Sequence, residues 1–288
     1  MDLAARLRAH PRFKEAARGM IANYLTPFRG AELLNNVTSS EILQYISGYI
    51  IYLDYWRREN DPYSGVLAGS VRDFCQERGL AKPARALALF NALRAAGLLK
   101  AEPRLHGVRV TRYRLSNSVI EMVRPMMGAV ARAASLLDRG DDFQRHLDAY
   151  PSAALTIVAH TYEAFYLKTG PILQQVPELR PYIARDSAFK IILSAYSSDG
   201  QRDVGAAGFS SLAEWFGVSR LHVSRVIRSG EQAGHLKLVS RGGRNVEISE
   251  SLSEALDEAM SVTMALILEG QRRAEEYDRA LGRVPSLV

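Results

Sequence analysis

The stretch FSSLAEWFGVSRLHVSRVIRSGEQAGHLKLVSRGGRNVEIS, residues 209–249, contains in order the signals for a helix, a tight turn, a second helix and a short hairpin. Ser211 and Glu214 have the spacing of a capping box, which predicts the start of the first helix. Gly217 supplies the turn, and Ser219 is placed to cap the second helix. This order of features decides the fold that we expect.

The second helix of this stretch has one apolar and one polar face. Its apolar positions follow the i, i+3, i+4, i+7 spacing of an inward stripe: Val223, Val226, Ile227 and Gly230. Its other side chains are basic or polar with one exception and are predicted to face outward: Arg220, Leu221, His222, Ser224, Arg225 and Arg228.

A hairpin follows this helix. Apolar side chains alternate on either side of a Gly-Gly turn: Leu236 and Leu238 before it, Val246 and Ile248 after it. This pattern predicts two antiparallel strands. Arg241 and Arg244 would stand at the tip.

The LAE..GVSR..VSR core resembles the MarR family and the DNA-binding domain of catabolite-activator-type regulators over about forty residues. The resemblance implies a winged helix-turn-helix, which places one helix in the major groove of DNA. In the catabolite-activator pattern S-R-x-x-V-x-R, two arginines read bases, which implies this role for Arg220 and Arg225, with Ser219 facing a phosphate. Leu221 departs from the pattern, because an acidic residue often stands there. A leucine predicts contact with a thymine methyl, or no base reading.

The same order of features occurs a second time. AGLLK at 96–100 matches AGHLK at 233–237 with an offset of 137, and YRLS at 113–116 matches VEIS at 246–249 with an offset of 133. Further matches are Val71, Phe74 and Gly79 with Leu212, Phe216 and Gly217, and the capping box Ser118/Glu121 with Ser251/Glu254. The first hairpin is therefore four residues longer.

The first copy has fewer base-reading groups. Its recognition helix, 83–96, is predicted to bury Ala86, Leu89, Phe90 and Leu93 and to expose Lys82, Ala84, Arg85, Ala88, Asn91 and Arg94. Its hairpin is strongly basic: Lys100, Arg104, His106, Arg109, Arg112 and Arg114. This hairpin would follow a phosphate backbone or enter a minor groove. The alternatives are a solvated hairpin and a copy that has become a packing surface.

Positive charge is concentrated in the two copies. The chain has a formal net charge of +6, yet residues 66–116 hold ten Lys/Arg against three Asp/Glu, and residues 209–249 hold six against three. The two copies therefore carry +10 and the rest −4, which places the positive potential where an anionic polymer would bind.

Composition indicates a globular protein. The chain has 288 residues, 47% of them hydrophobic, enough for one or two cores. Asp2, Arg6 and Arg8 precede any apolar run, and no stretch of 18 uncharged residues occurs, so we expect a cytoplasmic protein with no membrane partner. Cys75 is the single cysteine and is expected to be a small buried hydrophobe.

No pattern of residues points to catalysis. The six histidines lack metal-ligand spacing, and no nucleophile elbow, phosphate loop or dinucleotide fingerprint occurs. We therefore expect no enzyme activity, no metal and no cofactor.

Helical periodicity predicts further helices at 13–24, 39–55, 118–137, 142–150, 151–168, 173–182, 188–196 and 252–281. The last has a broad apolar stripe, Leu252, Leu256, Ala259, Val262, Leu266 and Ile267, which would need a partner, and we expect a homodimer. The resulting segments are an N-terminal helical segment (1–37), a first winged domain (38–138), a helical connector (139–186) and a second winged domain with the long helix (187–288).

One segment of the connector has the composition of an effector site: Ile157, His160, Thr161, Tyr162, Phe165 and Tyr166. Aromatics at this spacing also suit a core. We expect a sequence-specific transcriptional regulator that binds double-stranded DNA through tandem winged helices. The alternatives are a plasmid replication initiator and a non-enzymatic chromosome-organisation or protein-interaction factor.

Overall fold

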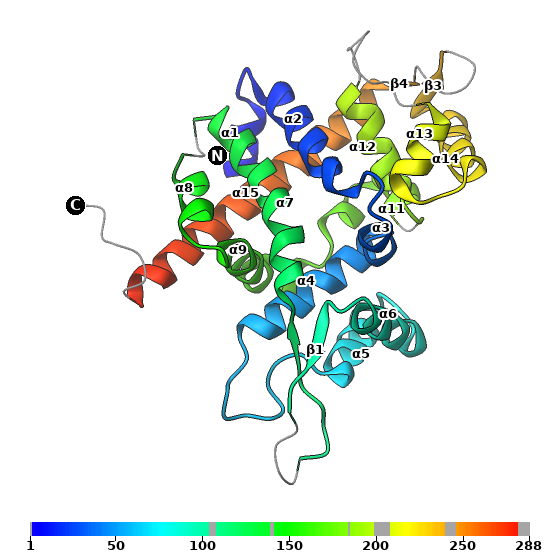
Figure 1. Ribbon diagram of the computed structural model, residues 1–288. Helices are drawn as coiled ribbons and strands as arrows, with labels where there is room; N and C mark the ends of the chain where they lie inside the picture. Colours follow the sequence, from blue (N-terminus) through cyan, green and yellow to red (C-terminus); the bar gives the residue numbers. More distant parts are fainter. Residues whose placement is uncertain are drawn as a thin grey trace. The chain divides into compact units, whose positions relative to one another are not determined.

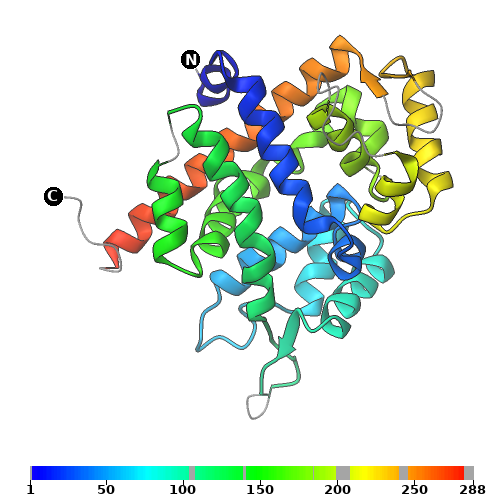
Figure 2. The same cartoon turned by 45° about the horizontal axis from the view of Figure 1, so that its top comes forward.

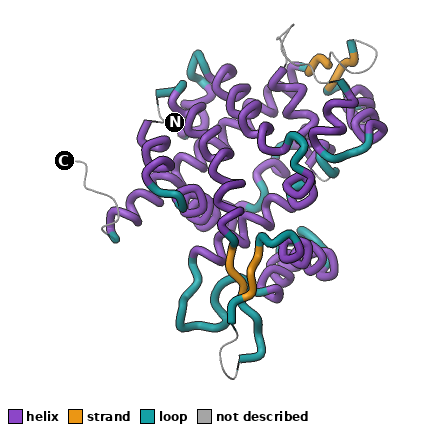
Figure 3. Tube along the Cα trace, viewed as in Figure 1, coloured by secondary structure: helices purple, strands orange, loops and turns teal. Residues whose placement is uncertain are grey.

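The computed structural model describes residues 2–103, 108–138, 141–183, 185–198, 208–239 and 246–281. Most of these residues are helical, and the strands form two separate two-stranded antiparallel sheets (Figure 3). The expectation of a mainly α fold with two small hairpins is confirmed. In this part of the chain, no helix combines the length and the apolar character needed to cross a bilayer.

The chain divides into two compact units. Unit I comprises Met1–Glu41, Ala129–Asp141 and Pro171–Ala265, and unit II comprises Ile42–Gly128, Asp142–Gly170 and Leu266–Val288. Each unit contains one copy of the repeated sequence. The predicted domain boundaries stay a prediction.

Unit II holds the first copy. Its elements are α4 (Glu41–Tyr55), α5 (Ala68–Glu77), α6 (Pro83–Ala95), β1 (Leu99–Ala101), β2 (Tyr113–Leu115), the first part of α7 (Asn117–Ser135), α8 (Asp141–Ala149), α9 (Ala153–Thr161), a π-helical turn (Tyr162–Tyr166), α10 (Leu167–Thr169) and the last part of α15 (Glu250–Ala280). Helices α5 and α6 pack together, and α6 contacts β1 (Figure 1). We call residues 68–115 the N-terminal repeat.

The core of unit II is rich in aromatic rings. Phe74 of α5 stacks on Tyr49 of α4, with ring centroids 3.7 Å apart. Gly48 is required beside them, because a Cβ there would lie 2.6 Å from the Tyr162 ring. These contacts fix α5 and the π-helical turn on α4.

Unit I holds the second copy. Its elements are α1 (Leu3–Arg8), α2 (Phe13–Leu25), η1 (Thr26–Phe28), α3 (Glu32–Val37), the end of α7, η3 (Ile172–Gln175), η4 (Pro177–Leu179), α11 (Arg180–Ile183), α12 (Ala188–Ser198), α13 (Phe209–Phe216), α14 (Arg220–Gln232), β3 (Leu236–Leu238), β4 (Val246–Ile248) and the first part of α15. Helix α14 packs on α13 and on β3 (Figure 1 and Figure 2). We call residues 209–248 the C-terminal repeat.

Two helix predictions need correction. The helix expected at 173–182 is replaced by two 3-10 turns and the four-residue α11. Pro177 and Pro181 explain this, because proline removes a backbone donor and blocks the preceding turn. The helix expected at 151–168 becomes α9 followed by a π-helical turn.

The three predicted capping boxes are also wrong. Helix α13 begins at Phe209, α7 at Asn117 and α15 at Glu250, each before the serine expected to cap it. At α15 the serine two residues earlier takes the role, since Oγ of Ser249 accepts a hydrogen bond from the Leu252 N–H at 3.3 Å. The chain enters α7 and α15 directly from the hairpins.

The apolar stripe of α15 is largely covered within the chain. Leu252, Leu256 and Ala259 are fully buried, whereas Val262, Leu266 and Ile267 are half-buried. The stripe therefore does not supply the exposed surface on which the homodimer was expected.

Candidate nucleic-acid interface

The turn of the C-terminal repeat depends on one glycine. Gly217 follows α13 and has φ of 63°. This left-handed conformation is unfavourable for residues other than glycine. The Val218 N–H then donates to the Ala213 carbonyl at 3.0 Å. Oγ of Ser219 accepts a hydrogen bond from the His222 N–H at 3.1 Å, which confirms Ser219 as the cap of α14.

The inner face of α14 agrees with the sequence pattern. Val223, Val226, Ile227 and Gly230 are buried, as predicted. Gly230 allows Leu236 of β3 to lie against the helix, because a Cβ at 230 would stand 2.5 Å from Leu236 Cδ1. The hairpin therefore sits directly on the helix.

The outer face of α14 carries unneutralised positive charge. Arg220, Arg225 and Arg228 are exposed, and none of them makes a hydrogen bond or an ion pair with another residue that the structure describes. By contrast, many exposed arginines elsewhere have carboxylate partners, such as Arg272 with Glu269 at 2.6 Å. Leu221 stands among the three arginines and is 57% exposed.

His222 and Ser224 are less open than predicted. Both are half-buried, and Nε2 of His222 donates to the backbone carbonyl of Asp186 at 2.7 Å. This bond fixes the start of α14 to the segment that precedes α12. The imidazole of His222 therefore has a structural role.

The second hairpin pairs Leu236 with Ile248 and Lys237 with Glu247, whose charged groups lie 3.4 Å apart. The carboxylate of Glu231 accepts a hydrogen bond from the Leu238 N–H at 2.9 Å. The predicted tip residues Arg241 and Arg244, with the Gly-Gly turn, lie outside the described residues.

The two repeats share their local backbone geometry. Gly79 and Gly217 both have φ of 63°, and Gly97 and Gly234 both have φ of 71°. Helices α6 and α14 both have 13 residues, and the buried positions of α6, Ala86, Leu89, Phe90 and Leu93, correspond to those of α14 at the offset of 137. The strand pairs Leu99↔Leu115 and Leu236↔Ile248 match at the two predicted offsets.

One match between the repeats is shifted. The Leu80 N–H donates to the Cys75 carbonyl at 2.9 Å, which corresponds to the bond between Val218 and Ala213. This correspondence aligns Phe74 with Leu212, not with Phe216 as the sequence suggested. Cys75 is buried, and burial raises the pKa of its thiol to about 11.

Helix α6 exposes the side chains that were predicted. Lys82, Ala84, Arg85, Ala88, Asn91 and Arg94 are all exposed. Lys82 and Arg85 have no ion-pair partner in the described part of the chain, whereas Arg94 lies over the Tyr113 ring at 5.2 Å. In the hairpin, Lys100 and Arg109 are exposed, and Arg104 and His106 lie outside the described residues.

The sequence predicts that Arg112 lies on the open surface of the hairpin. This prediction is wrong, because the side chain of Arg112 is only 13% exposed. Its guanidinium pairs with Glu102, lies 3.6 Å from Glu59 and donates to the carbonyls of Arg58 and Asp61 at 3.2 and 3.3 Å. Arg112 therefore anchors the hairpin to the loop that follows α4.

Arg112 belongs to a wider network of alternating charges. Arg57 bridges Asp54 at 3.3 Å and Glu59 at 2.6 Å, and Arg114 lies 3.6 Å from Glu102. The hydrogen bond from Arg57 lowers the pKa of Glu59, and burial raises the pKa of Asp54. Three arginines here face three carboxylates, so the charges of Arg112 and Arg114 are balanced by neighbours.

A buried lysine supports the C-terminal repeat, and its sequence context does not signal this. Lys190 of α12 is 2% exposed, and its Nζ donates to Asn35 Oδ1 at 3.3 Å and to Thr38 Oγ1 at 3.2 Å. Burial lowers its pKa to about 7. Asn35 in turn donates to the Trp215 carbonyl of α13 at 2.8 Å, so Lys190 and Asn35 together link α12, the N-terminal segment and α13.

Comparisons of the chain with protein-family models, with curated proteins and with solved structures find no match.

Proposed function

We propose that the chain is a cytoplasmic, sequence-specific transcriptional regulator that binds double-stranded DNA, with α14 as the helix that enters the major groove. The main support for this proposal is the outer face of α14. Arg220, Arg225 and Arg228 project from one helix without partners among the described residues. Their charge favours an anionic polymer, and the groove of B-DNA, about 12 Å wide, accepts one helix.

The chemistry of this face supports reading of bases. An arginine can bind both O6 and N7 of guanine, and this bidentate contact discriminates between base pairs. Leu221 offers an apolar contact that suits a thymine methyl. In this proposal Ser219, which caps the start of the helix, faces a phosphate.

The two repeats have different proposed roles, because their charges differ. The C-terminal repeat reads sequence through α14. The N-terminal repeat contributes phosphate contacts through Lys82, Arg85 and Arg109, which lack ion-pair partners among the described residues. As in the families that the sequence resembles, we propose a homodimer, and the molar mass of the intact chain in solution tests this.

Selection of bound sequences from a random pool of double-stranded DNA tests the main proposal. The intact chain should enrich one site, and a variant with Arg220, Arg225 and Arg228 changed to alanine should enrich none. Arg132→Ala is the matched control, because Arg132 is exposed on a helix of the same unit. Failure of the intact chain to bind DNA at low salt would instead favour a protein-interaction factor.

A second candidate follows from the presence of two helix–turn–helix–hairpin segments in one chain, an arrangement that plasmid replication initiators also use. The selected site distinguishes the two functions. A palindrome beside a promoter supports the regulator, whereas repeated sites beside an origin support the initiator.

A further inference from the structure

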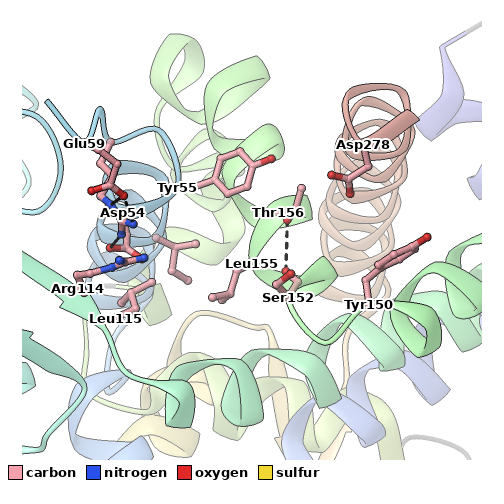
Figure 4. A pocket seen from close by; sticks show the side chains of 12 residues that line it. Asp54, Tyr55, Glu59, Arg114, Leu115, Tyr150, Ser152, Leu155, Thr156 and Asp278 are labelled. Carbon is pink, nitrogen blue, oxygen red and sulfur yellow. Dashed lines mark hydrogen bonds and ion pairs between the residues drawn. The ribbon is translucent and has the colours of Figure 1, made fainter. Parts of the chain in front are cut away.

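Unit II contains a cavity of about 360 Å³ beside the first hairpin. Its lining comes from the end of α4, strand β2, the start of α9 and the end of α15 (Figure 4). The volume lies at the lower end of the range for small-molecule sites, roughly 300–1,000 Å³. The cavity therefore suits a small ligand.

The cavity is not formed by the residues that the sequence suggested for an effector. Ile157, His160, Thr161 and Tyr162 are buried in the core, and none of the six suggested residues lines the cavity. The cavity is instead lined by Leu155 and Thr156, the two residues that directly precede Ile157 on the same helix.

One wall of the cavity offers little free charge. Asp54, Glu59 and Arg114 stand together on this side (Figure 4). They belong to the network in which arginines and carboxylates alternate, so each charge there is already balanced by a neighbour.

The opposite wall carries Asp278, so the lining holds three carboxylates, Asp54, Glu59 and Asp278, against two arginines, Arg57 and Arg114. Asp278 of α15 lies 3.5 Å from Nε2 of His146, and Glu275 lies 3.7 Å from Nδ1 of the same ring. One imidazole, which holds at most one positive charge, is shared by two carboxylates. The side chain of Asp278 is only 10% exposed, so solvent screens this charge weakly.

Aromatic and apolar groups lie between and beside these walls. Tyr55 stands between them, and Tyr150 stands on the side of Asp278 (Figure 4). Leu155 adds apolar surface. Tyrosine faces attract organic cations, and a carboxylate beside them adds to the attraction.

We infer that this cavity binds a small organic ammonium ion with an apolar body. The ammonium group lies against Asp278 and Tyr150, and the body lies over Leu155 and Tyr55. Because Arg114 and Leu115 of β2 also line the cavity, an occupant contacts the first hairpin directly. The inference does not rest on the proposed DNA binding.

Titration calorimetry of the full chain without DNA tests the inference with three probes of similar size. These are 2-phenylethylammonium, 3-phenylpropionate and the neutral 3-phenylpropan-1-ol. The ammonium probe should bind at least tenfold more tightly than the other two. Equal affinities, or no binding of the ammonium probe at millimolar concentration, would overturn the inference.

Two variants locate the site. Asp278→Asn should weaken binding of the ammonium probe at least tenfold, whereas Glu276→Gln, which removes the same charge from an exposed position on α15, should leave it unchanged. Leu155→Trp fills the cavity and should abolish binding, and it replaces the first variant if Asp278→Asn does not fold. Unchanged affinity in a folded Asp278→Asn or Leu155→Trp chain places the probe elsewhere and contradicts the inference.

Discussion

The ammonium of Lys190 lies 3.3 Å from Oδ1 of Asn35 and 4.1 Å from the centre of the Phe28 ring, and no carboxylate that the structure describes pairs with it. A protonated lysine in this site loses its hydration without gaining an opposite charge. Its pKa therefore falls to about 7 in the folded protein, from an ordinary value of 10.5.

This shift predicts a stability that rises with pH. Between pH 7 and about 10.5 the unfolded chain binds more protons at Lys190 than the folded chain, so the free energy of unfolding should increase by an amount on the order of a few kcal/mol. Below pH 7 both states are protonated and the destabilisation is complete. Urea unfolding at several pH values measures the slope, which Lys190→Met should reduce. The exposed Lys82→Met is the control and should keep the slope of the parent.

If α14 reads bases, removing one of its arginines should weaken DNA binding by an amount that depends on the DNA sequence. Arg225→Ala should cost about 1–3 kcal/mol on the selected site and much less on random DNA, because a bidentate contact to guanine is lost only where guanine is present. Arg220→Ala should behave in the same way. Fluorescence anisotropy with both DNAs measures the difference. Equal losses would assign these arginines to phosphates.

The charge network predicts that Arg112 acts on stability. Arg112→Ala leaves partly buried Glu102 without its main partner, and the free energy of unfolding should fall by about 3 kcal/mol. The exposed Arg109→Ala should change stability by less than about 0.5 kcal/mol. If the N-terminal repeat contacts DNA, Arg109→Ala should instead lower the salt dependence of binding by about one phosphate contact. A stable Arg112→Ala chain would contradict the anchoring role.

The close packing of β3 on α14 predicts that one added methyl group, at position 230, lowers the free energy of unfolding. Gly230→Ala would place Cβ 2.5 Å from Leu236 Cδ1 and 2.8 Å from its Cγ, and the strain should cost about 1–3 kcal/mol. Gly69 of α5 has no atom within 4 Å of the same position, so Gly69→Ala should stabilise by up to about 1 kcal/mol. Thermal unfolding of the two variants compares them, and equal effects would show that the contact relaxes without cost.

Local periodicity predicts most of helices α6 and α14. The buried stripes of α6 and α14 follow from residue spacing alone, because each position on a regular helix fixes its neighbours three and four residues away. Helix starts are less predictable. Serine followed by glutamate three residues later also occurs inside α15, and only the end of the preceding strand shows where the helix begins.

Contacts between distant residues account for what the sequence does not reveal. The partner of His222 is a backbone carbonyl 36 positions away, and the partner of Lys190 is an amide 155 positions away. Arg112 has the same local context as an exposed hairpin arginine, yet Glu59 and the loop after α4 enclose it. Such pairings depend on the tertiary fold, so no local sequence pattern predicts them.

The two repeats share their backbone geometry but not their outward side chains. The left-handed glycines and the four inward positions of α6 and α14 have the same geometry, whereas outward side chains differ at corresponding positions, for example Ala88 and Arg225. We therefore expect that exposed residues without such long-range contacts, for example Ala88 and Arg225, can be exchanged between α6 and α14 without disturbing either interior. One chain thus presents two different outward surfaces on the same backbone geometry.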